Sequence, residues 1–325
     1  MRLARILGSI AFAAALAAPA AAQTEYPDRP ITLVLPLGAG GSHDLHARGI
    51  TGVISDILGQ PMVVKLVPGG AGMKGSKEVA DADPDGYTII FTHNGFDQIV
   101  PQTRDAGFDP VTAFTAIAKI NQAEPILCAA ADEPFQTLEE LVAYAKEHPG
   151  ELNFGHSGNW GAGHIPTMQF VNASEIDVNL IPHQGGGPTL QALLAGEDDV
   201  GYLFTTQARD HVKAGTLKCM AVAGDKPLAD DPDFADLPTM ASLGYPNVSF
   251  TMERIFMAPA GVPEDRLEKL RGAFAELMEN KSFQSFIRNI GEKVDFEGGA
   301  EYDEKRPGRL EEYKVLIEKV GGGGN

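Results

Sequence analysis

The stretch from Ile31 to Asp44 reads ITLVLPLGAGGSHD and opens an α/β fold. Ile31 to Leu35 is short, apolar and partly β-branched, which is typical of a buried strand. A proline and a glycine-rich loop follow, and the residues from Asp44 to Leu58 form a helical pattern. A strand, a glycine loop and a helix in this order predict the first unit of a parallel sheet with helices on its faces.

The same alternation continues along most of the chain. We predict further strands at residues 61–66, 87–91, 152–154, 178–181, 200–204 and 217–223. The predicted helices are 72–80, 137–148, 164–172, 189–194, 208–214, 263–280, 282–290 and 301–320. At 325 residues with 43% hydrophobic residues, the chain is long enough for two domains, each with its own core.

The N-terminus has the pattern of a secretory signal peptide. Arg2 and Arg5 precede an apolar run from Ile6 to Ala18, and small residues lead up to Gln23. About 13 apolar residues are too few for a bilayer span, which needs roughly 20. We therefore expect residues 1–22 to be removed and the mature chain to be periplasmic, with no lipid anchor because no cysteine lies near the cleavage site.

The charge balance limits the partners of the chain. The formal net charge is −18, and removal of Arg2 and Arg5 makes it −20. Such a chain does not bind nucleic acid through its phosphates and is repelled by an anionic membrane surface. An anionic ligand would need local hydrogen-bond donors that overcome this unfavourable field.

Glycine-rich loops provide such donors. Four of them follow a predicted strand and precede a predicted helix: residues 36–44 (PLGAGGSHD), 67–75 (VPGGAGMKG), 155–164 (GHSGNWGAGH) and 183–188 (HQGGGP). Each loop exposes backbone N–H groups and points the positive end of a helix at its contents. The loops lack the spacing of a P-loop or a dinucleotide fingerprint, so we predict no nucleotide chemistry and no cofactor.

Six of the eight histidines lie in or beside these loops or at strand ends: His43, His46, His93, His156, His164 and His183. Their ring nitrogens could donate hydrogen bonds to a carboxylate, ligate a metal, or serve only as polar loop groups. We favour ligand contact for His43 and His183, and capping or packing for His46 and His164. Asp44 lies early in a helix, where a carboxylate usually serves the helix N-terminus.

Two other residue types leave alternatives open, and a third does not. Cys128 and Cys219 lie in apolar, strand-like runs and are either two buried thiols or a disulfide, if their strands are neighbours. Trp160, inside a glycine loop, either lines a cleft or packs on the next helix. The paired carboxylates Asp198 and Asp199 are expected on a solvated face.

The ordered set of motifs resembles the extracytoplasmic solute receptors of the tripartite tricarboxylate transporter family, also called Bug-type receptors. The resemblance runs almost end to end. It rests on YPDRPITLVLPLGAGGSHDLHAR (26–48), PGGAGMKGSKEVADADPDGYTIIF (68–91), PGELNFGHSG (149–158), HQGGGPTLQALLAGEDDVGYLF (183–204) and APAGVPEDRLEKL (258–270).

The resemblance implies a type II periplasmic-binding-protein fold, in which two parallel-sheet lobes are joined by a two-crossover hinge. Lobe I would combine residues 24–122 and 224–325, and lobe II would be residues 123–223. A carboxylate would be held between them. The implied contacts are Gly40, Gly41, Ser42, His43, Asp44, Thr92, Asn94, Ser157, Gly158, Asn159, His183, Gly185, Gly186, Gly187, Phe204 and Thr205.

The chain also differs from the family pattern near this expected site. His43 stands where the family has small residues, and His156-Ser157 stands where it has a pair more like two serines. These differences bear on the ligand rather than on the fold. The histidines favour a di- or tricarboxylate.

On this basis the function expected is that of a Venus-flytrap receptor, not an enzyme. It would act as a monomer and pass its ligand transiently to integral membrane subunits of a transporter. Three alternatives stay open at this point: a periplasmic metal-binding protein that uses the loop histidines, a sensor for a membrane kinase, and a hydrolase that uses Ser157 or His183.

Overall fold

Ile31–Leu35 forms β1 of a six-stranded sheet in the computed structural model, which describes residues 25–321. This sheet and its helices are called lobe I. Its strand order is β11-β4-β10-β3-β1-β2. The strands are β1, β2 (Met62–Leu66), β3 (Thr88–His93), β4 (Phe114–Ala123), β10 (Met252–Pro259) and β11 (Glu297–Gly298). The helices are α1 (Ser42–Leu58), α2 (Met73–Ala80), α3 (Val100–Thr103), α8 (Glu264–Glu279), α9 (Lys281–Asn289) and α10 (Gly299–Gly321), with a π-helical turn at Gly95–Ile99.

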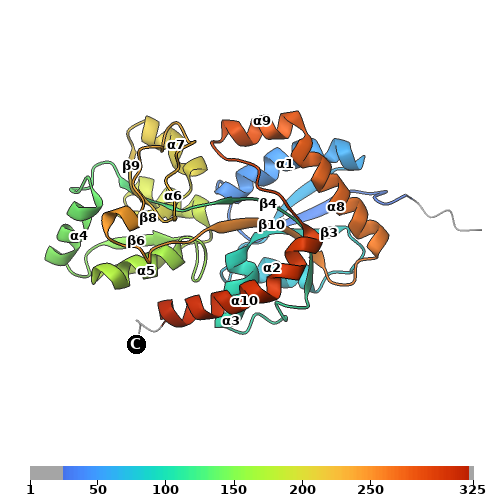
Figure 1. Cartoon of the computed structure of the whole chain (residues 1–325), viewed down its shortest axis with the longest axis horizontal. Coiled ribbons are helices and arrows are strands. Elements are labelled where there is room, and N and C mark those ends of the chain that lie inside the picture. The colour runs from blue at the N-terminus through green and yellow to red at the C-terminus, as the bar shows by residue number, and fades with distance from the viewer. Residues whose placement is uncertain (1–24, 322–325) are drawn as a thin grey trace, which may run out of the picture.

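A second sheet with the order β7-β6-β8-β5-β9 forms lobe II beside lobe I (Figure 1). Its strands are β5 (Ile126–Ala130), β6 (Asn153–His156), β7 (Asn179–Pro182), β8 (Val200–Leu203) and β9 (Leu217–Val222). Its helices are α4 (Leu138–Glu147), α5 (His164–Ser174), α6 (Gly186–Ala195) and α7 (Thr205–Lys213), and a short 3₁₀ turn spans Ala241–Leu243. The predicted signal peptide lies outside the described residues.

Each sheet is parallel in part. Strands β2, β1 and β3 run parallel in lobe I, and β7, β6 and β8 do so in lobe II. Strands β4 and β10 of lobe I, and β5 and β9 of lobe II, pair antiparallel with their neighbours. The predicted parallel sheet thus corresponds to three strands of each lobe, while β10 in lobe I and β5 in lobe II run the other way.

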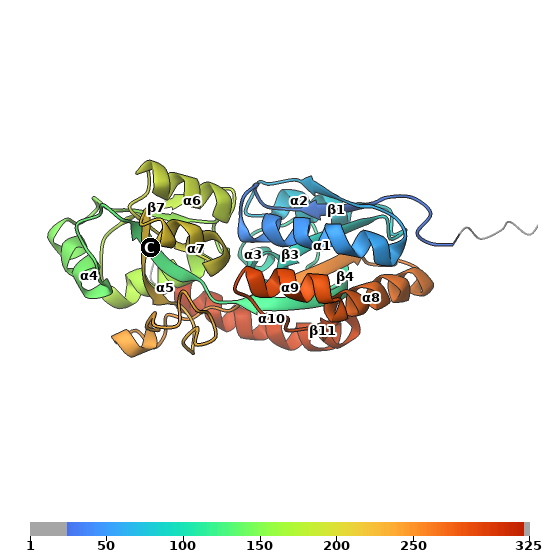
Figure 2. The same cartoon turned by 90° about the horizontal axis from the view of Figure 1, so that it is seen from above.

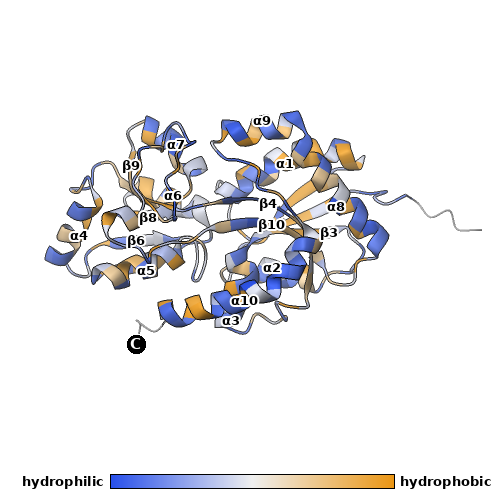
Figure 3. Ribbon diagram, viewed as in Figure 1, coloured by the Kyte–Doolittle hydropathy of each residue, from blue (hydrophilic) through white to orange (hydrophobic). Residues whose placement is uncertain are grey.

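Apolar side chains fill both lobes. Ile31, Leu33 and Leu35 on β1 are buried against Ile50 and Ile54 of α1 in the larger core. Lobe II has separate clusters on the two faces of its sheet. Hydrophilic and hydrophobic residues alternate along the outer helices α4 and α8, as expected where one helix face packs on a sheet (Figure 3).

The chain crosses between the lobes twice, through β4 to β5 and then back to β10 (Figure 1). On the return, Met240 and Val248 are buried in the lobe II core. These contacts favour a lobe boundary near Phe250 over the predicted one after Ala223. Helix α10 begins beside β4 and ends against α5, where Asn172 Nδ2 donates to the Val320 carbonyl at 3.4 Å, so it bridges both lobes.

Cys128 on β5 and Cys219 on β9 face each other across neighbouring antiparallel strands and form a disulfide. Of the two alternatives left by the sequence, the bridge is therefore correct. It joins residues 91 positions apart within lobe II.

Candidate functional site

Three helix N-termini meet at one small cavity between the lobes. Helix α1 of lobe I begins at Ser42, and α6 and α7 of lobe II begin at Gly186 and Thr205. Figure 2 shows α6 and α7 facing the start of α1 across the gap. The cavity is lined by Leu37, Gly38, Gly41, Ser42, His43, Asp44, His93, Ser157, Ala162, Gly186, Tyr202, Phe204, Gln207 and Met252.

The lobes are in close contact around this cavity. The Gly38 N–H donates to the Gln184 carbonyl at 2.7 Å, which joins the two glycine loops directly. The cavity has a volume of about 20 Å³, which is room for about one water molecule. A carboxylate can therefore enter only when the lobes open, and the side chains that line the cavity must make room for it when the lobes close again.

Residues of both lobes that the sequence predicts as ligand contacts line this cavity. Seven of the residues expected to touch a ligand line the cavity: Gly41, Ser42, His43, Asp44, Ser157, Gly186 and Phe204. Asp44 is already engaged, because its Oδ2 accepts the Gly40 N–H at 2.9 Å and its Oδ1 pairs with Arg48 at 3.0 Å. It therefore holds the loop before α1, as its position in the first turn suggested.

Gln207 is a cavity residue that the sequence did not reveal. It lies one turn into α7, and its Oε1 accepts the Phe204 N–H at 3.4 Å. Its Nε2 is buried and has no hydrogen-bond partner among the described residues. An unsatisfied buried donor is costly, and a ligand oxygen in the cavity would satisfy it.

A buried ion pair lies directly beneath Ser42. Arg254 on β10 is fully buried, and both of its terminal nitrogens bond to Glu292, at 2.7 and 3.0 Å. Arg254 also donates to Ser42 Oγ, and the Thr206 hydroxyl of lobe II lies 3.0 Å from the same oxygen. Burial alone would raise the pKa of Glu292, but Arg254 and His46 lower it to about 2. The pair stays ionised, and its cation polarises the Ser42 hydroxyl as a donor toward the cavity.

The cavity histidines are neutral. Burial lowers the pKa of His43 well below its usual range, and the nearby Arg254 lowers it further. Burial and Arg254 also lower the pKa of His93 to about 3. A second positive charge next to buried Arg254 is unfavourable in this low-dielectric environment.

His183 is placed differently from the expectation. Its Nε2 lies 2.6 Å from Asp198 Oδ2, and it does not line the cavity between the lobes. Asp198 is fully buried, so the expectation that it lies on a solvated face is wrong. The pair fastens the loop before α6 to the residues just before β8.

The other expected contacts surround the cavity without lining it. The Asn94 side chain donates to the Thr251 carbonyl at 2.9 Å and to Tyr313 Oη at 2.6 Å, which ties β3 to β10 and α10. Thr92 supplies its carbonyl to His43. The rest lie around the cavity, in its loops or in the first turns of α6 and α7: Gly40, Gly158, Asn159, Gly185, Gly187 and Thr205.

The histidines do not assemble a metal site. Within residues 25–321, no three His, Cys, Asp or Glu side chains converge in a way that could hold a metal ion. His156 and His164 pack against each other with ring centroids 4.4 Å apart, and His164 Nδ1 accepts the Trp160 N–H at 3.1 Å. Trp160 packs near this histidine and the end of α10. In the described part of the chain, no helix is long and apolar enough to cross a membrane.

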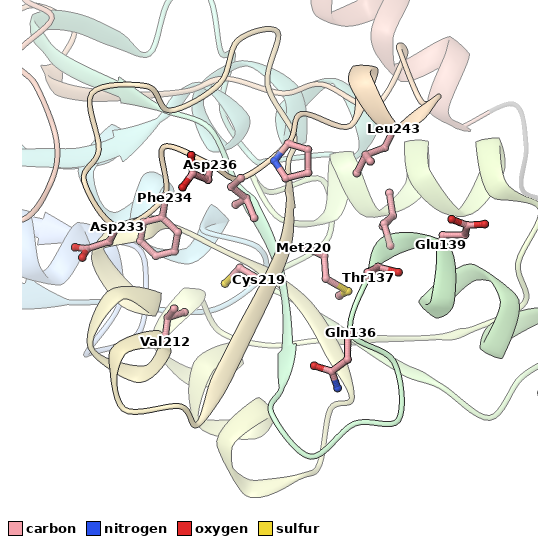
Figure 4. Close-up of a pocket in the computed structure, with 13 residues that line it drawn as sticks. Gln136, Thr137, Glu139, Val212, Cys219, Met220, Asp233, Phe234, Asp236 and Leu243 are labelled. Atoms are coloured by element: carbon pink, nitrogen blue, oxygen red, sulfur yellow. The ribbon is translucent and has the colours of Figure 1, made fainter.

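Two larger hollows are poorly suited to an anion. One, of about 590 Å³, lies within lobe II beside Cys219 and carries Glu139, Asp233 and Asp236 on its walls (Figure 4). The other, of about 560 Å³, lies beside the crossover from β4 to β5 and has five carboxylates against two cationic side chains: Glu124, Asp230, Asp231, Glu292 and Asp295 against Arg288 and Lys293. Their excess negative charge would repel a carboxylate.

Comparisons with known proteins agree with this architecture. Residues 46–321 match the model of the tripartite tricarboxylate transporter family receptor. The structure is similar to that of the periplasmic binding protein BugD, with a TM-score of 0.86 and 28% identity over 91% of this chain and 99% of that one.

Two further solved structures carry ligands. Rpa4515 of R. palustris with adipate has a TM-score of 0.84 and 26% identity, over 91% of this chain and 99% of that one. MatC of Rhodopseudomonas palustris with bound malate has a TM-score of 0.80 and 26% identity, over 92% and 99%. These neighbours are binding proteins rather than enzymes, and they confirm the two-lobed periplasmic-binding-protein fold. The chain therefore belongs to the tripartite tricarboxylate transporter receptor family.

Proposed function

We propose that this chain captures a small carboxylate in the cavity between its lobes and presents the closed form to membrane subunits of a tripartite tricarboxylate transporter. The observation that carries the proposal is the convergence of the α1, α6 and α7 N-termini on one cavity. Helix N-termini bind anions through free N–H groups and a positive end potential. No Lys or Arg side chain lines the cavity in the described part of the chain.

The surroundings of the cavity support an anionic ligand group. Gln207 Nε2 and the Ser42 hydroxyl add two side-chain donors, one from each lobe. Donors from both lobes reach a bound carboxylate only when the lobes close, so binding favours closure. The adipate and malate held by the two solved neighbours are both carboxylates.

Delivery outside the inner membrane follows from the predicted signal peptide and from the family. The expected mature N-terminus is Gln23. N-terminal sequencing of the protein from a periplasmic extract should return Gln23 as the first residue. Recovery with residues 1–22 attached, in the cytoplasmic fraction, would contradict this part of the proposal.

A thermal-shift screen of residues 23–325 tests the binding function. The panel contains mono-, di- and tricarboxylates, the matching primary amides, and zinc with and without a chelator. A ligand that binds only the folded state stabilises it by about 2.7 kcal/mol at a hundredfold excess over its Kd. We expect chelator-independent shifts with one or a few carboxylates and none with the amides. A shift with zinc alone, abolished by the chelator, would replace the carboxylate proposal with a metal-binding function.

A further inference from the structure

His43 has a fixed place at the cavity wall. It lies in the first turn of α1 and is 4% exposed, with its ring centroid 4.9 Å from that of Phe91 and 5.3 Å from that of His93. From the sequence alone, this residue is expected to donate a hydrogen bond to a carboxylate. The hydrogen bonds of His43 and of its neighbour His93 point to a different role for His43.

The contacts of His43 define which nitrogen carries its hydrogen. Nε2 lies 3.2 Å from the Thr92 carbonyl oxygen. A carbonyl oxygen only accepts, so Nε2 is the protonated nitrogen and donates to Thr92. Because burial and Arg254 keep the ring neutral, Nδ1 carries a lone pair and is an acceptor. Nδ1 has no hydrogen-bond partner among residues 25–321.

His93 has the opposite arrangement. Its Nδ1 accepts the Gly95 N–H at 3.1 Å, and its pKa is lowered to about 3, so its hydrogen is on Nε2. The His93 ring therefore offers a donor to the cavity and the His43 ring offers an acceptor. The other groups described above, which are the helix N–H groups, Gln207 Nε2 and the Ser42 hydroxyl, all donate. The carboxylate of Asp44 is occupied by Gly40 and Arg48.

We propose that His43 Nδ1 is a specificity-determining acceptor, which selects carboxylates that carry a hydrogen-bond donor, a hydroxyl or an ammonium group, close to the carboxylate. This inference rests on the proposed function and narrows its ligand class. A ligand without such a donor leaves Nδ1 of this largely buried residue unpaired, which is the kind of mismatch that produces discrimination between similar ligands. Adipate lacks such a group and malate has one, so the structural neighbours do not decide the choice.

The test uses three series of acids that differ only at the carbon next to a carboxylate: propionate, lactate and alanine; succinate, malate and aspartate; glutarate, 2-hydroxyglutarate and glutamate. Affinities are measured by calorimetry for the wild type, His43→Phe and His43→Leu. His148→Phe serves as the control, because that histidine is partly exposed in lobe II and stacks on Tyr144. Melting temperatures of all four proteins show that each variant is folded.

In the series that binds, we expect the wild type to favour the hydroxy or amino acid over the unsubstituted acid by about fivefold, the factor equivalent to one net hydrogen bond of about 1 kcal/mol. His43→Phe and His43→Leu should lose this preference, whatever their affinity for the unsubstituted acid, while His148→Phe keeps it. A preference for the hydroxy acid alone identifies a hydroxyl as the donor, and one for the amino acid alone identifies an ammonium group.

Two results would overturn the role of His43 while leaving the proposed function intact. One is equal affinity of the wild type for all members of a binding series, and the other is a preference that persists in both His43 variants. If no acid of the three series binds the wild type, selection by His43 is ruled out, because the ligand class on which it depends is then wrong. If the wider carboxylate panel is also silent, the proposed function fails as well.

Discussion

Gly187 of lobe II lies so close to Ala39 of lobe I that a Cβ atom on Gly187 would be 2.1 Å from the Ala39 carbonyl oxygen. The same Cβ would be 2.8 Å from the backbone nitrogen of Gly41. Real Cβ atoms do not approach backbone this closely, so any larger side chain must push the lobes apart. The absence of a side chain at Gly187 is thus a condition for closure of this cavity.

Gly187→Ala should therefore shift the protein toward an open form. Alanine favours the α6 helix, so the lobes themselves stay folded. A fall of the closed fraction to about a tenth weakens ligand binding about tenfold. Small-angle scattering should show a larger radius of gyration for the variant, and calorimetry the weaker binding.

Gly52→Ala is the matched control for this experiment. A Cβ at Gly52 in α1 meets no atom within 4 Å, so the substitution should leave both the radius of gyration and the affinity unchanged. Wild-type affinity in Gly187→Ala would mean that the contact between the two glycine loops is not needed for binding.

Gln207→Glu should weaken carboxylate binding strongly. The two side chains have almost the same shape, and a carboxylate oxygen of the new side chain can still accept the Phe204 N–H that Gln207 Oε1 accepts. Only the unpartnered Nε2 donor is replaced, by an acceptor that repels an anion. A lost hydrogen bond to a charged group is worth about 1.5–3 kcal/mol, so the Kd should rise by at least about tenfold. Titration calorimetry measures it, and an unchanged Kd would exclude Gln207 from the site.

Arg254→Met should destabilise the protein by about 3–5 kcal/mol, because it leaves Glu292 buried without its main counter-charge. In the double variant with Glu292→Met, the loss should be smaller than the sum of the two single losses, since the residues form one network. Urea unfolding gives the free energies. The matched control is Lys293→Met, which breaks an exposed pair with Asp230 and should change the stability by less than about 1 kcal/mol. Equal effects of Arg254→Met and Lys293→Met would contradict a structural role for the buried pair.

Stability should fall between pH 6.5 and about 4. Burial and His164 lower the pKa of His156 to about 3, and burial lowers that of His164 to about 4, whereas the unfolded chain binds these protons near pH 6.5. Both histidines thus contribute stability that is fully present above pH 6.5 and is lost as the pH falls toward their folded-state values. At pH 5 the loss is about 2 kcal/mol for each histidine.

Urea unfolding at pH 7.5 and pH 5 measures this loss. His156→Gln and His164→Gln should each show a smaller drop than the wild type, and His148→Gln, at a partly exposed position, should show the full drop. A wild-type stability that is the same at both pH values would contradict the burial of neutral histidines.

The sequence predicted the elements whose signals are local. The β1 strand, the glycine loop and α1 follow one another within 28 residues, and the glycines mark the loops at which the helix N-termini meet. It missed β4 and β10, the crossover strands, because buried polar residues interrupt their apolar pattern. Lys119 and Asn121 lie on β4, and Arg254 lies on β10.

Pairs of residues that lie far apart in the sequence explain why the remaining features of the site could not be predicted. Arg254 and Glu292 are 38 residues apart, and His46 and Glu292 are 246 apart, so no spacing rule links them. Gln207 resembles any polar residue in the first turn of a helix until the fold places it beside Gly186. The sequence predicts ligand contact for His183 but does not reveal that its Nε2 pairs with Asp198.

Titration calorimetry of the wild-type mature chain with a carboxylate from the screen and with its matching primary amide measures whether the cavity recognises a negative charge. The helix N-termini, Gln207 and Ser42 supply donors that favour a negative charge, so we predict a Kd for the carboxylate at least about tenfold lower than for the amide, a difference of at least about 1.4 kcal/mol. Equal affinities for the two would show that the cavity does not recognise the charge and would overturn the proposed carboxylate site.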